Sequence, residues 1–143
     1  MSIRIRNDLT AEWDARGVKK GVEYAILTDE ITKAWTGMTT RQYKNYKGLK
    51  KENLRDNMSD LELVLNMLAE ATTTEVSKKV QPSTFEENRA VAKTGGEAAR
   101  DARKAVEART GSPVITKQNA IDFTNVIELV AGIEEKPQED TEK

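Results

Sequence analysis

Apolar side chains recur at helical spacing along much of the chain, most clearly after Ser59. Ser59 and Glu62 form a capping box, in which each side chain accepts a hydrogen bond from the other residue's backbone N–H. The apolar positions that follow are spaced as in an amphipathic helix: Leu61, Val64, Leu65, Leu68 and Ala71. This pattern predicts a helix that reaches Lys78 or Lys79.

Two more capping boxes predict further helix starts. Thr39 and Gln42 begin a short helix, because the threonine hydroxyl and the glutamine amide can satisfy each other's backbone N–H. Ser83 and Glu86 open a long alanine-rich helix that we expect to end near Arg109. Both helices are predicted from local signals alone.

Weaker patterns predict short helices over residues 11–16 and 28–36 and a last helix over residues 118–133. Thr28 is the expected N-cap of the second, and Gly37 its left-handed stop. The predicted fold class is therefore all-α.

A minor two-stranded element remains an alternative at the margins of this fold. It would pair Val114-Ile115 with residues 3–5 or residues 24–27, which are short apolar runs. We expect one helical domain over residues 1–133. Residues 134–143 carry five acids and two lysines without apolar anchors, so we expect a disordered acidic tail.

Composition narrows the function classes. The 143 residues include no cysteine and no histidine, which excludes disulfides, thiolate metal sites and histidine as a general base or zinc ligand. We expect no catalytic residues, no metal and no cofactor. No apolar run approaches the roughly 18 residues that a membrane span needs, and the N-terminal sequence is unlike a signal peptide. We expect a cytoplasmic protein without membrane contact.

A basic segment over residues 39–55 is the densest candidate site, with a local charge of +5. Tyrosines among its cations could stack on exposed bases, and the cations suit phosphate oxygens. The predicted nucleic-acid-binding residues are Arg41, Tyr43, Lys44, Lys47, Lys50, Lys51 and Arg55. Helices over residues 28–36 and 39–47 around Gly37-Met38 also have the outline of a helix-turn-helix. The alternative is an ordinary solvated charged face, since the net charge of the whole chain is −1.

A strip of small residues in the long alanine-rich helix is a candidate packing surface. Its members are Ala92, Gly95, Gly96, Ala99 and Ala102. Two adjacent glycines inside a helix each cost about 1 kcal/mol relative to alanine, so a close contact should compensate for them. That contact could lie within the monomer or across the interface of a homodimer. We also predict that the protein is a homodimer.

Several runs resemble the C-terminal part of the bacterial DNA-damage-inducible protein D (DinD) family. The runs are residues 12–18, 23–28, 48–58, 60–73, 85–88 and 91–93, together with Gly95-Gly96. The resemblance covers roughly residues 7–119. Members of that family begin with a phage-antirepressor-like (Bro-type) domain, of which we expect no counterpart here. The family pattern also has a glycine where this chain has Arg100.

The resemblance implies a bacterial or prophage gene of the DNA-damage (SOS) response that acts on recombinase–single-strand filaments or their products. It implies no catalytic residues. We therefore expect a non-enzymatic regulatory protein that binds single-stranded DNA, duplex DNA or a recombinase filament through residues 39–55. The alternative is a dimeric protein-interaction module that inhibits or titrates a protein partner, with an acidic tail that mimics DNA. Abundant carboxylates leave a metal-dependent nuclease-like enzyme as a third hypothesis.

Overall fold

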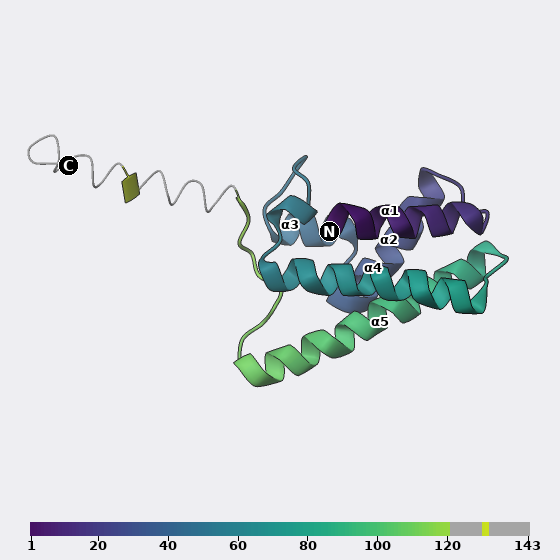
Figure 1. Ribbon diagram of the computed structural model, residues 1–143. Coiled ribbons are helices and arrows are strands. Elements are labelled where there is room, and N and C mark those ends of the chain that lie inside the picture. Colours follow the sequence, from purple (N-terminus) through teal and green to yellow (C-terminus); the bar gives the residue numbers. More distant parts are fainter. Residues whose placement is uncertain (121–129, 132–143) are drawn as a thin grey trace, which may run out of the picture.

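The computed structural model describes residues 1–120 and 130–131, and over these residues the chain is helical and contains no strand (Figure 1). The elements are α1 (Ser2–Ala15), α2 (Val22–Thr36), α3 (Thr40–Tyr46), the 3-10 helix η1 (Arg55–Asn57), α4 (Asp60–Val80) and α5 (Phe85–Thr110). The all-α prediction is confirmed. The two-stranded alternative is wrong, since residues 3–5 and 24–27 are helical and Val114-Ile115 lies in a bend.

The capping boxes predicted at Thr39 and Ser59 are both present. The third begins one residue later than expected, because Thr84 pairs with Glu87. The Glu87 carboxylate also accepts a hydrogen bond from the backbone N–H of Ser83 at 2.7 Å, so the predicted cap residue is still bound to this helix start.

The two N-terminal helices are longer than the sequence predicts. Thr28 lies inside α2, where its hydroxyl donates to the carbonyl of Tyr24 at 2.8 Å, so it is not an N-cap. In α1, Leu9 and Trp13 are buried, and this helix packs along α4. Tertiary burial, more than local propensity, therefore sets the extent of both helices.

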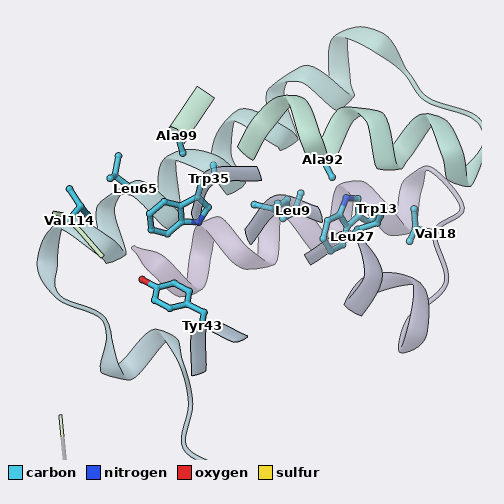
Figure 2. Close-up of a cluster of buried hydrophobic side chains, with 12 residues drawn as sticks. Leu9, Trp13, Val18, Leu27, Trp35, Tyr43, Leu65, Ala92, Ala99 and Val114 are labelled. Carbon is cyan, nitrogen blue, oxygen red and sulfur yellow. The ribbon is translucent and has the colours of Figure 1, made fainter. Parts of the chain in front are cut away.

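The core lies among α1, α2, α4 and α5, with α1 packed along α4 (Figure 1). Figure 2 shows Leu9, Trp13 and Leu27 toward one end of the cluster, and Trp35 and Tyr43 toward the other. Such large aromatic side chains supply much of the buried area in a domain that has few of them.

The small-residue strip of α5 packs within one chain. Ala92, Gly95, Gly96 and Ala99 are buried, and Ala102 is half-buried against the core. A Cβ atom added at Gly95 would lie 2.8 Å from the backbone nitrogen of Thr73, so α4 approaches the helix closely there. Of the two placements that the sequence allows, the structure has the one within the monomer.

The predicted last helix and the acidic tail lie mostly or wholly outside the described residues. Among those described, no helix combines the length and the apolarity that crossing a bilayer requires.

Candidate nucleic-acid interface

A groove runs between α1, α2, α3 and the loop that follows α3. It consists of two hollows of about 750 and 500 Å³, which share Arg6, Thr28, Thr40 and Lys44 in their walls. Because the four shared residues come from three helices, the groove is a product of the tertiary fold.

The groove is cationic. Its basic side chains are Arg6, Arg41, Lys44, Lys50, Lys51 and Arg55. Its acidic side chains are Asp29, Glu52 and Glu70, so the positive charges exceed the negative ones by three. A backbone hydrogen bond from Lys50 lowers the pKa of Glu52, which therefore stays ionised on the rim. The excess positive charge favours an anionic partner.

Two arginines on the groove wall are held by one buried carboxylate. Glu70 is 3% exposed, and its Oε2 accepts hydrogen bonds from Arg6 at 3.3 Å and from Arg55 at 2.7 Å. Arg6 also donates to Thr28 at 2.8 Å, and Arg55 donates to Ser2 at 2.6 Å. A guanidinium has five N–H donors, so both arginines keep donors beyond these bonds.

Glu70 fixes the relative position of the two guanidinium groups. Both groups donate hydrogen bonds to the same carboxylate oxygen of Glu70. An anion that reaches one arginine is therefore close to the other. Arg6 is further restrained by the ring of Trp13, whose centroid lies 5.3 Å from its guanidinium carbon. Preorganised side chains lose less conformational entropy on binding than free ones do.

Tyr43 and Lys47 do not take part in this groove, which corrects their predicted placement. Lys47 is 1% exposed, and its Nζ donates to Glu62 at 2.7 Å. The same amino group donates to the carbonyls of Thr116 and Gln118 at 2.8 and 2.7 Å. Tyr43 is also fully buried and donates its hydroxyl to Glu62.

Tyr43 and Lys47 lie away from the groove because of the helical period of α3. Residues 43 and 47 are four apart and share the inner face, whereas residues 41 and 44 are turned toward the groove. Burial and the hydrogen bond to Glu62 raise the pKa of the Tyr43 phenol, which therefore stays protonated. The ring that remains accessible on α3 is that of Tyr46, which lies 5.6 Å from the amino group of Lys117.

Comparison with known proteins connects this groove with a family. The family model described as the DinD C-terminal domain matches residues 3–124. The chain belongs to the DinD C-terminal domain family. The resemblance stated from the sequence is thus confirmed, and the match includes every helix that lines the groove. No curated protein and no solved structure matches the chain.

In this DinD C-terminal domain, α2 and α3 do follow each other across a tight turn at Gly37, as in a helix-turn-helix. However, both helices line the same hollow, so α3 forms a wall of the groove instead of standing out alone. A single helix inserted into a duplex groove is therefore not what this geometry presents.

Sequence reasoning missed Arg6 altogether. It lies far from the basic segment along the chain, and α1 brings it to the centre of the groove. The only local signal was that Arg4 and Arg6 alternate with isoleucines, and that pattern does not distinguish a site residue from a surface residue.

Proposed function

We propose that this DinD C-terminal domain is a non-enzymatic DNA-damage-response or prophage regulatory protein that holds a nucleic-acid backbone in its cationic groove. The observation that carries the proposal is the convergence of basic side chains from α1, from α3 and from the loop after it onto one hollowed surface. Lysines and arginines in such a groove release condensed counterions when they contact phosphates, and this release drives binding.

The lining favours single-stranded DNA, alone or as presented by a recombinase filament. Between the cations, the larger hollow is also lined by the exposed Ala25 and the half-buried ring of Tyr24, with the buried Leu49 behind them. Grooves that combine cations for the backbone with apolar or aromatic surface for unstacked bases are typical of single-strand binding. The family's association with the DNA-damage response agrees with such a ligand.

A salt titration of DNA binding tests the proposal. The triple variant Lys44→Ala/Lys50→Ala/Lys51→Ala should bind single-stranded DNA at least about tenfold more weakly at low salt. Its log–log salt slope should be flatter by about 2, since each lost contact to a single strand removes roughly 0.7. Circular dichroism should show an unchanged fold, because Lys50 and Lys51 are exposed and Lys44 is half-buried.

The matched control removes three lysines outside the groove: Lys78, Lys79 and Lys104, all exposed on α4 and α5. This variant has the same net charge as the groove variant, so it should bind like the parent if location matters. Equal losses in the two variants would instead indicate nonspecific attraction. An unchanged affinity of the folded groove variant would refute the proposal.

A second candidate function is self-association, and it is favoured by an apolar stripe on α4. Leu61, Val64 and Leu68 are 44%, 56% and 40% exposed and recur at helical spacing on the outer face. A net charge of −1 offers little repulsion between copies. If the stripe is a dimer interface, Val64→Glu should convert a dimer to a monomer in sedimentation without loss of stability. A parent that sediments as a monomer would contradict this.

A further inference from the structure

We infer that the acidic C-terminal segment, residues 134–143, occupies the cationic groove and competes there with DNA. The inference rests on the proposed function, because it assigns a regulator to the same groove. The segment would act as an intramolecular competitor, so that only a ligand of higher charge or affinity displaces it.

Charge complementarity is the first support. The segment carries five carboxylates against two lysines, a net charge of −3, and the groove lining has an excess of three positive charges. Glu70 holds Arg6 and Arg55, whereas the other groove cations form no ion pair within the described part of the chain: Arg41, Lys44, Lys50 and Lys51. Carboxylates can bind arginine in the same bidentate manner as phosphates do.

The second support is where the continuously described part of the chain, residues 1–120, ends. Ala120 donates its backbone N–H to the side chain of Asn57 at 2.7 Å, and the Asn119 amide donates to the carbonyl of Lys47. Lys47 and Asn57 bound the loop that supplies Lys50, Lys51 and Arg55 to the groove. The chain therefore leaves the described domain beside the groove's own wall.

The third support is reach. Thirteen residues separate Ala120 from Glu134. A helix of that length would span about 20 Å and an extended chain about 45 Å, so either would let the acidic segment arrive at the groove. Tethering at this distance gives an effective concentration on the order of millimolar, which suffices for a weak electrostatic contact to be populated.

The extent of the family match supports a regulatory role for the acidic segment. It ends at residue 124, so the acidic segment lies beyond the part of the chain that the family shares. A segment outside the shared fold can modulate the groove without contributing to the core.

The test uses the full chain with a neutral tail. Its substitutions are Glu134→Gln, Glu135→Gln, Glu139→Gln, Asp140→Asn and Glu142→Gln. We expect the variant to bind a single-stranded oligonucleotide roughly three- to tenfold more tightly than the parent at low salt. The difference should vanish near 0.5 M salt, where the Debye length falls to roughly 4 Å.

The control neutralises five exposed acids elsewhere, so that net charge changes equally. These acids are Asp8, Asp14, Glu75, Glu86 and Asp101. A gain in the neutral-tail variant that clearly exceeds the gain in this control supports competition by the tail. Equal gains would overturn it, because they would show a general effect of charge.

A second measurement separates this inference from the proposed function. A labelled peptide of residues 134–143 is titrated onto the neutral-tail protein, with and without the Lys44/Lys50/Lys51 triple substitution. Weak, salt-sensitive binding that the triple substitution abolishes supports the inference even if no DNA binds. If the groove variant loses DNA affinity while the neutral tail changes nothing and the peptide does not bind, the proposed function stands and the inference is overturned.

Discussion

Lys47→Met should lower the free energy of unfolding by about 3–5 kcal/mol, the cost typical of removing one partner of a buried ion pair. The amino group of Lys47 neutralises Glu62, and both side chains are fully buried. Methionine fills a similar volume but leaves the carboxylate with neutral donors only. It also removes the donor that binds the carbonyls of Thr116 and Gln118. Urea denaturation followed by circular dichroism measures the loss.

Two further variants make this prediction specific. Lys50→Met changes an exposed lysine three residues later and should alter stability by no more than about 0.5 kcal/mol. Lys47→Met/Glu62→Gln should regain part of the loss, because glutamine removes the uncompensated charge and still accepts from the backbone N–H of Ser59. A Lys47→Met protein as stable as the parent would contradict the buried placement. Such a result would indicate that Lys47 lies on the surface, where its amino group could contact a phosphate.

The Lys47–Glu62 ion pair also explains why the basic segment, residues 39–55, forms a basic surface only in part. Glu62 accepts hydrogen bonds from Tyr43, Lys47 and its own cap residue, so one carboxylate joins α3, the start of α4 and residues 114–120. A fully buried lysine is rare, and sequence spacing alone cannot predict one. The capping box at Ser59 could be predicted from the sequence, but the buried ion pair between its Glu62 and Lys47 could not.

The parts of the fold that were predictable are those with local causes. The boxes at Thr39 and Ser59 and the stop at Gly37 each depend on residues within one helical turn. The start of α1 has no such signal, since no side chain caps it and its first turn holds no acidic residue. Its helix is stabilised by burying Leu9 and Trp13, and this contact depends on residues distant in sequence.

The residues of the candidate site also fall into a group that the sequence predicts and a group that it does not. Arg41, Lys44, Lys50, Lys51 and Arg55 were predictable because they are clustered along the chain, and all five line the groove. Arg6 was not predictable, because its place depends on how α1 crosses the bundle. The role of Glu70 was hidden for the same reason, since both of its arginine partners belong to other elements.

Gly96→Ala should destabilise the domain by about 2–4 kcal/mol, although the same change inside an exposed helix stabilises it by about 1 kcal/mol. An added Cβ at Gly96 would lie 2.5 Å from the carbonyl oxygen of Ile31 and 2.6 Å from the Cβ of Ala34. The first of these atoms belongs to the backbone of α2, which cannot move away as a flexible side chain would. The helices must separate, and the contacts of α5 with α2 weaken along their length.

Thermal denaturation should show this as a fall in Tm on the order of 10 °C, and Gly96→Leu should lower Tm further. Thr94→Ala, an exposed change two residues earlier on the same helix, should leave Tm almost unchanged. Sedimentation of the folded fraction adds a second criterion. Because Gly96 packs against α2 of its own chain, the alanine variant should lose stability without any change in association state. A variant that keeps its Tm but changes its association state would instead place the strip of small residues at an interface between two copies.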